Sequence, residues 1–199
     1  MKNLIILLSF LALVFSCSNS NSAKTETKTE DSTEMNEQSV WRVSNSTDEF
    51  NNVVGEILIA DFSGSMRNSA TTDGSVEGSF VVFPDSTIRL CMYEYGEYPI
   101  SEALYEIHIQ DQKGNVVEFT ESVYDSSAGC MDIINALSSY RLNGETYINS
   151  NLNKMHEMFL NNDKLKFYVA SEYDTKYNFE FSTLGTKKSF DKFFKKAKK

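Results

Sequence analysis

An alternation of apolar and polar residues recurs between Trp41 and Gly185, and it is the feature that most constrains the fold. A period of two places every second side chain on the same face of a β-strand, whereas a helix would need a period near 3.6. The pattern therefore predicts strands that are buried on one face. The alternating runs are Ile88 to Met92, Tyr105 to Ile109, Leu165 to Val169 and Tyr177 to Phe181.

Turn signals and two helical patterns complete this picture. The segment Asp111 to Asn115 has hairpin length, with Gly114 where a positive φ is needed, and Asn143-Gly144 is a further turn signal. Asp132 to Tyr140 and, more weakly, Leu152 to Leu160 have helical spacing of apolar residues. Together these patterns predict a mainly β fold: an antiparallel β-sandwich or barrel-like domain with two or three short helices.

The C-terminal tail has the pattern of an amphipathic basic helix. Phe190, Phe193 and Phe194 share one helical face, and an aromatic stripe at this spacing usually packs in a core. Lysines in the last turns interact favourably with the helix dipole. We expect the phenylalanines to pack on the domain, and contact of the basic helix with lipid headgroups is the alternative. The lysines, set against the single Asp191, are Lys187, Lys188, Lys192, Lys195, Lys196, Lys198 and Lys199.

The N-terminus has the features of an export signal. Leu4 to Phe15 is an apolar run that is shorter than the roughly 20 residues needed to span a bilayer core. The segment Val14-Phe15-Ser16-Cys17 resembles the lipobox of bacterial lipoproteins, although Phe15 is bulkier than the usual residue. The resemblance implies cleavage before Cys17 and acylation of its sulfur and new amine with chains such as palmitate, which would anchor the protein stably. The alternative is an ordinary secretory peptide with an incidental cysteine.

The composition after Cys17 predicts the domain boundaries. Residues 18 to 39 contain no large apolar residue except Met35, so this stretch cannot bury enough apolar surface to offset its ordering entropy. We therefore predict a lipoprotein signal peptide over residues 1–16, a flexible polar linker over 17–39, and a single β-rich domain with a basic C-terminal helix over 40–199.

The stretch DFSGSM, Asp61 to Met66, resembles the metal-ion-dependent adhesion site of von Willebrand factor A domains. The resemblance implies that Asp61, Ser63 and Ser65 would bind Mg²⁺ through oxygen ligands. The family also has a parallel sheet and a long helix after this loop, whereas turn-forming residues follow Met66 here. We expect a strand that runs into a polar loop without a metal, and the Mg²⁺ site is the alternative.

Cys91 and Cys130 are the two cysteines that remain if Cys17 carries lipid. An exported protein lies in an oxidising compartment, so we expect them to form a disulfide. The bond would close a loop of about 40 residues and contribute about 3 to 4 kcal/mol in the chain-entropy model. It would also fix the predicted helix after Cys130 onto the sheet. Two buried free thiols are the alternative.

Charge and motif content restrict the function. The net charge of −9 disfavours binding to a phosphate backbone, so nucleic acid is not an expected partner. The sequence has no nucleophile elbow and no specific Cys-His pair, so we assign no catalytic residues and no cofactor.

These observations predict a lipid-anchored, exported protein of the bacterial cell envelope with a non-catalytic binding or structural role. The N-terminal lipid would hold it in a membrane, with the outer membrane preferred, and the unidentified ligand would be an envelope protein or glycan. Two other functions stay open: a Mg²⁺-dependent A-domain-like adhesin that uses DFSGSM, and an envelope glycan hydrolase, which would need two convergent carboxylates.

Overall fold

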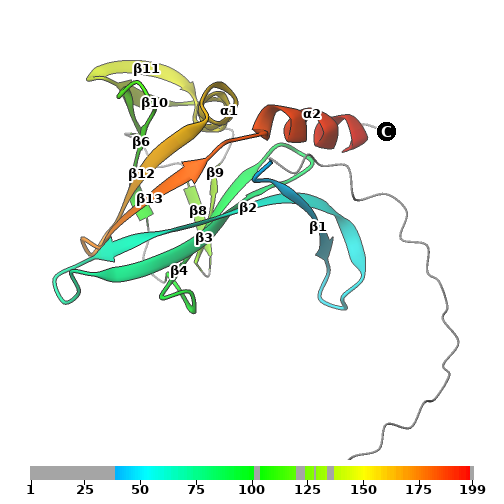
Figure 1. The fold of residues 1–199 in the computed structure, drawn as a ribbon, viewed down its shortest axis with the longest axis horizontal. Helices are drawn as coiled ribbons and strands as arrows, with labels where there is room; N and C mark the ends of the chain where they lie inside the picture. Colours follow the sequence, from blue (N-terminus) through cyan, green and yellow to red (C-terminus); the bar gives the residue numbers. More distant parts are fainter. Residues whose placement is uncertain (1–38, 101–103, 120–123, 128, 134–136, 198–199) are drawn as a thin grey trace, which may run out of the picture. The chain divides into compact units, whose positions relative to one another are not determined.

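The computed structural model describes residues 39–100, 104–119, 124–127, 129–133 and 137–197. The chain divides into two units, Met1–Asp31 and Ser32–Lys199, and all described residues lie in the second unit. They form one sheet of 13 strands and two helices (Figure 1). The strands are β1 (Arg42–Thr47), β2 (Val53–Arg67), β3 (Gly74–Val82), β4 (Ile88–Glu94), β5 (Tyr98–Pro99), β6 (Leu104–Gln110), β7 (Val116–Phe119), β8 (Tyr124–Ser127), β9 (Cys130–Ile133), β10 (Leu137–Leu142), β11 (Glu145–Ser150), β12 (Lys164–Ser171) and β13 (Lys176–Ser182); the helices are α1 (Asn151–Asn161) and α2 (Thr186–Ala197).

Every strand pairing in this sheet is antiparallel, which confirms the predicted fold class. The strand order is β11-β10-β7-β6-β12-β13-β2-β3-β4-β9-β8, and β1 and β5 pair in addition with β2 and β4. The 15-residue β2 joins the two halves of the sheet, because its first part pairs with β1, its last four residues pair with β13, and β3 runs along most of it (Figure 1).

Burial follows the period of two that the sequence predicted. In β13, Tyr177, Phe179 and Phe181 are buried, while the residues between them face outward. The buried side chains form one aromatic-rich core, in which the rings of Phe62 and Phe179 stack with centroids 3.9 Å apart. Burial of these apolar side chains is the main favourable term in folding.

The two helices begin and end at residues with a clear local reason. Ser150 is the N-cap of α1, and its hydroxyl accepts a hydrogen bond of 3.2 Å from the backbone N–H of Asn153. Before α2, Gly185 has a φ of 76°, and a Cβ there would lie 2.8 Å from Cα of Ser39. The helix predicted over Leu152 to Leu160 is therefore confirmed as α1, and the tail helix is confirmed as α2.

The helix predicted over Asp132 to Tyr140 is wrong. Its described residues belong to β9 and β10, where Ile133 pairs with Ile88 and Tyr140 pairs with Phe119. Short apolar runs fit both periodicities, and here the neighbouring strands supply the hydrogen bonds that decide between them. The turn after β10 is as predicted: Asn143 and Gly144 have φ values of 51° and 92°, as in a type I′ hairpin.

Candidate functional site

DFSGSM lies in the middle of β2 and not in a loop. The strand continues to Arg67, so the prediction that the strand runs into a polar loop within this stretch is wrong. Because side chains alternate along a strand, the side chains of Asp61, Ser63 and Ser65 all lie on the exposed face, while Phe62 is buried on the other. Arg42 Nη2 on β1 donates to both carboxylate oxygens of Asp61, at 3.1 and 2.8 Å.

This geometry differs from that of the A-domain metal site. Residues two apart in a strand are about 6.6 Å apart, whereas the oxygens around Mg²⁺ lie about 2.1 Å from the metal and must converge on it. The strand β2 pairs antiparallel with β1, β3 and β13, and the next element after Met66 is β3, not a helix. Within the described residues, no group of three or more His, Cys, Asp or Glu residues is arranged to hold a metal.

The glycine of DFSGSM has a packing role. Gly64 lies opposite Phe179 of β13, and a Cβ at Gly64 would lie 2.3 Å from the carbonyl oxygen of Asn178 and 2.6 Å from Cβ of Phe179. Gly78 of β3 lies opposite Phe62 in the same way. Each glycine thus leaves room for an aromatic side chain on the neighbouring strand. Such a cross-strand aromatic residue compensates for the missing side chain of a glycine in a sheet.

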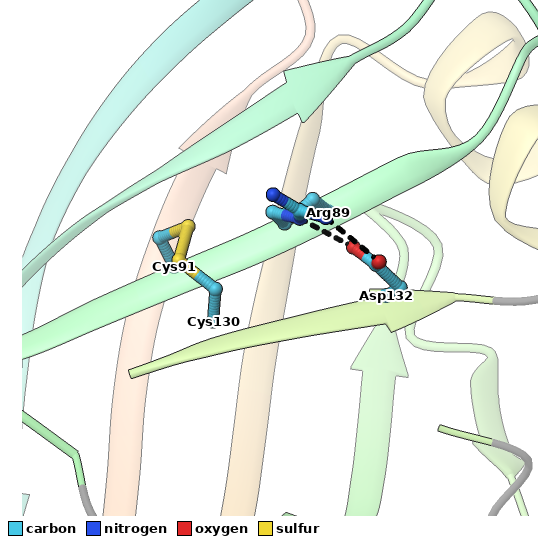
Figure 2. The surroundings of a disulfide bond; sticks show 4 residues. All are labelled: Arg89, Cys91, Cys130 and Asp132. Atoms are coloured by element: carbon cyan, nitrogen blue, oxygen red, sulfur yellow. Dashed lines mark hydrogen bonds and ion pairs between the residues drawn. A yellow bond between two sulfur atoms is a disulfide. The ribbon is translucent and has the colours of Figure 1, made fainter. Parts of the chain in front are cut away.

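The cysteine pair joins two neighbouring strands. Cys91 of β4 and Cys130 of β9 are direct partners in the register, with Sγ atoms 2.03 Å and Cα atoms 4.0 Å apart (Figure 2). Met92 N–H donates to the carbonyl of Gly129, so the cysteines occupy the closely spaced, non-hydrogen-bonded type of pair. The structure therefore brings together the two predicted cysteines, but the bond connects two strands and not a strand and a helix.

An ion pair strengthens the same strand junction. Arg89 and Asp132 are also direct partners, and Arg89 Nη2 donates to Asp132 Oδ2 at 2.9 Å (Figure 2). The hydrogen bond to Asp132 raises the pKa of the Arg89 guanidinium, which is charged at every physiological pH. Together the disulfide and the ion pair hold β9 on β4.

Three turns lie at one end of the sheet: residues 68–73, 95–97 and 172–175. We name these turns, together with Tyr98 directly after the second one, the turn end. The register places them together, because Gly74 pairs with Met66 and Lys176 pairs with Arg67, and Tyr95 N–H donates to the carbonyl of Ser75 at 2.9 Å. This end exposes three large aromatic side chains, of which two are close together in the sequence and the third is distant from them. They are Tyr95, Tyr98 and Tyr173, with exposed fractions of 50%, 62% and 71%.

Tyr95 also has an unusual backbone conformation. Its φ is 54° and that of Gly96 is 74°, as in a type I′ turn closed by a hydrogen bond from Glu97 N–H to the Glu94 carbonyl. Asn and Asp tolerate the first central position of such a turn far better than a bulky aromatic residue does. Since the side chain of Tyr95 is half exposed, packing does not account for a tyrosine at this position.

The opposite end of β13 leads into α2, and we name this region the α2 end: residues 39–41 together with α2 (Figure 1). Trp41 is 2% exposed, its ring packs edge-on against Phe190 at 5.1 Å, and its Nε1 donates to Thr186 Oγ1 at 2.6 Å. The hydroxyls of Ser39 and Ser189 share a hydrogen bond of 2.8 Å. The phenylalanine stripe of α2 packs on the domain as expected, with Phe190 and Phe193 buried and Phe194 partly buried.

His156 on α1 faces the same helix. Its ring lies 5.5 Å from that of Phe190, and its Nε2 is 2.9 Å from the carbonyl oxygen of Ser86. Burial lowers the pKa of His156, and the hydrogen bond to Ser86 opposes this effect only in part. The imidazole is therefore a neutral packing group at pH 7.

A polar pocket of about 270 Å³ lies between α1 and the β6–β7 turn. It contains two carboxylates, Asp111 and Glu157, but both have structural partners. Burial raises the pKa of Asp111, yet hydrogen bonds from Asn115 and Lys113 outweigh it and lower the pKa overall. Glu157 binds the buried Lys154 at 2.9 Å. A glycosidase acid needs a raised pKa, and the lowered pKa of Asp111 does not fit that role.

Cys17, the predicted lipidation site, lies outside the described residues. No helix in the described part of the chain combines the length and the apolar character needed to cross a membrane. No protein-family model, no curated protein and no solved structure matches the chain.

Proposed function

We propose that the chain is a lipid-anchored, exported protein of the bacterial envelope, with a non-catalytic role in binding an envelope protein or glycan at the turn end. The observation that carries this proposal is that the α2 end and the turn end lie at opposite ends of β13. The segment that would follow the anchored linker is held at α2, at one end of β13, whereas the exposed tyrosines lie at the other end. The seven residues of β13 span about 23 Å.

The chemistry of the turn end supports a binding surface. Tyrosines provide a large apolar contact area together with a hydroxyl, and they are enriched where proteins bind other proteins. The strained backbone at Tyr95 points in the same direction, because residues in sparsely populated conformations are concentrated at functional sites. Acidic side chains surround these rings, so the ligand would be neutral or basic. They include Glu97 and Glu172, whereas Asp174 is paired with Lys176 at 2.8 Å.

The anchor is tested with Cys17→Ser in the bacterial host. We expect the wild-type protein to fractionate with membranes and its N-terminal peptide to carry the mass of acyl chains, whereas the variant should lose both properties. A wild-type protein that is soluble, with an unmodified N-terminus, would exclude the proposed anchoring.

The binding surface is tested with a photo-crosslinking residue at position 98 of the full-length protein. Position 148 on the edge strand β11 is the matched control, because Ile148 is 80% exposed but lies far along the sheet from the turn end. We expect a discrete crosslinked product with an envelope protein or glycan from position 98 only, and we expect Tyr95→Asn to abolish it without loss of stability. Equal crosslinking from both positions would contradict the proposal.

A further inference from the structure

We infer that the lysine face of α2 binds the anionic phospholipid headgroups of the membrane that holds the anchor. This inference rests on the proposed lipid anchoring and adds a second, electrostatic contact that would orient the domain. The lysine face is the outward side of α2 and consists of Lys187, Lys188, Lys192 and Lys195.

These four lysines are available for a ligand. All are exposed, none has an ion-pair partner among the described residues, and together with Asp191 they line a shallow, open depression on the helix surface. A fifth lysine, Lys196, is already bound to Glu56 at 2.6 Å. Because the phenylalanine stripe of α2 is packed on the domain, the helix presents its charges and not its apolar side to the surroundings.

The charge distribution makes this face different from the rest of the domain. Residues 39–185 contain 22 Asp and Glu against 9 Lys and Arg, a net charge of −13. Residues 186–199 contain seven Lys against one Asp, a net charge of +6. An anionic surface therefore repels most of the domain and attracts α2, so electrostatics alone would select one orientation.

The predicted anchor brings this face to the membrane. Cys17 precedes Ser39 by 22 residues, and a flexible chain of that length spans about 25 Å on average. Ser39 is hydrogen-bonded to α2 itself, and the 12-residue helix is about 18 Å long. A tether of this length keeps α2 at a high effective concentration near the headgroups.

Insertion of an apolar tip is a weaker explanation for membrane contact. The group of strongly exposed apolar residues on the β1–β2 side of the sheet is Phe50, Val53 and Val54, and the turn before β2 also carries Asp48 and Glu49. An anionic leaflet repels these carboxylates, whereas on the lysine face four lysines outweigh the single Asp191.

The test is lysine footprinting of the full-length lipidated protein. It is purified from membranes and reconstituted either into phosphatidylcholine vesicles or into vesicles with about 30% phosphatidylglycerol, whose surface attracts basic residues. Acetylation rates of individual lysines are then measured by mass spectrometry. Lys166 and Lys176, on the outer face of β12 and β13, are internal controls.

We expect acetylation of the lysine face to slow by about fivefold or more with phosphatidylglycerol, since each lysine near an anionic surface contributes about fivefold in affinity. The protection should disappear in 1 M salt, where the screening length is about 3 Å. Lys188→Gln with Lys192→Gln should abolish protection of Lys187 and Lys195, whereas Lys166→Gln with Lys176→Gln should not. Equal rates in both vesicles, or equal protection of the control lysines, would overturn the inference.

Flotation of the same samples separates this inference from the proposed function. If the protein does not float with phosphatidylcholine vesicles, lipid anchoring is wrong. In that case salt-sensitive flotation with phosphatidylglycerol vesicles, lost in the Lys188 and Lys192 variant, would still support the lysine face, and its absence would overturn it.

Discussion

The two ends of β13 carry aromatic residues in opposite environments. At the α2 end, Trp41 is buried among Phe159, Phe181 and Phe190 and donates a hydrogen bond to Thr186. At the turn end, Tyr173 is largely exposed. Aromatic side chains at the first end therefore contribute to stability, whereas those at the second contribute contact area that folding does not use.

The α2 end and the turn end also differ in charge. The α2 end exposes lysines, and the turn end exposes carboxylates such as those of Glu97 and Glu172. The domain is thus polarised along β13, with packing and positive charge where the predicted linker joins it. Loops that carry function are commonly held by a rigid scaffold, and the turn end has this relation to the sheet.

Replacement of the buried tryptophan is the strongest test of this contrast. Trp41→Ala should lower the free energy of unfolding by about 3 to 5 kcal/mol, because it removes a fully buried ring and leaves a cavity. Tyr98→Ala should change it by less than about 0.5 kcal/mol, since the side chain is mostly exposed. Urea titration followed by circular dichroism measures both. Similar losses in the two variants would show that the turn end also belongs to the folding core.

The cysteine pair tests how firmly β9 is held on β4, the strand that leads into the turn at Tyr95. Cys91→Ala with Cys130→Ala should lower the free energy of unfolding by about 3 to 4 kcal/mol, because the bond closes a loop between residues 39 apart in the sequence. Reduction of the wild-type protein should have a similar effect and should not alter the double variant. Mass spectrometry of unreduced peptides checks the bond itself, and alkylation of both cysteines without reduction would contradict it.

A glycine pair on β2 tests the strand that connects the two ends. Gly64→Ala should cost about 1 to 3 kcal/mol or more, because the added Cβ meets a backbone oxygen that cannot move away cheaply. Gly55→Ala on the same strand is the matched control, since no atom lies within 4 Å of its added Cβ. Calorimetric melting of both variants measures the difference. Equal melting temperatures would show that β13 does not approach β2 as closely as described.

The sequence predicted the regular parts of this fold better than its exceptions. Strands such as β13 follow the period of two without interruption, and α2 has a clear apolar stripe whereas that of α1 is weaker, so local pattern and tertiary packing agree. The segment from Asp132 to Tyr140 failed because its short apolar spacing fits both a helix and two strands. Only the cross-strand partners Ile88 and Phe119 decide between them.

The candidate sites show the same limit. The pairing of Cys91 and Cys130 followed from counting cysteines, but DFSGSM gave a misleading signal, because a strand with Asp and Ser on its exposed face has the same letters as a metal-binding loop. The turn end was missed because Tyr173 is separated from Tyr95 by 78 positions, and only the sheet register joins them. Tyr95 and Tyr98 do lie in one acidic, tyrosine-rich stretch of the sequence, but Tyr173 lies outside it.

Acidification should lower the stability of the domain through His156, whose ring packs against Phe190 of α2, and this is the smallest expected effect. Burial lowers the pKa of His156 in the folded protein below its ordinary value of 6.5. Between these two pKa values the unfolded chain binds more protons than the folded one, so the free energy of unfolding falls as the pH falls through 6.5 toward the folded pKa. The stabilisation that depends on neutral, buried His156 is therefore fully present above pH 6.5. His156→Gln, which keeps a donor for the Ser86 carbonyl, should reduce the loss of stability between pH 7.5 and 5.5 relative to the wild-type protein. Denaturant titrations at the two pH values measure this loss of stability. If the loss in His156→Gln equals that of the wild-type protein, the ring is solvated and not packed against Phe190.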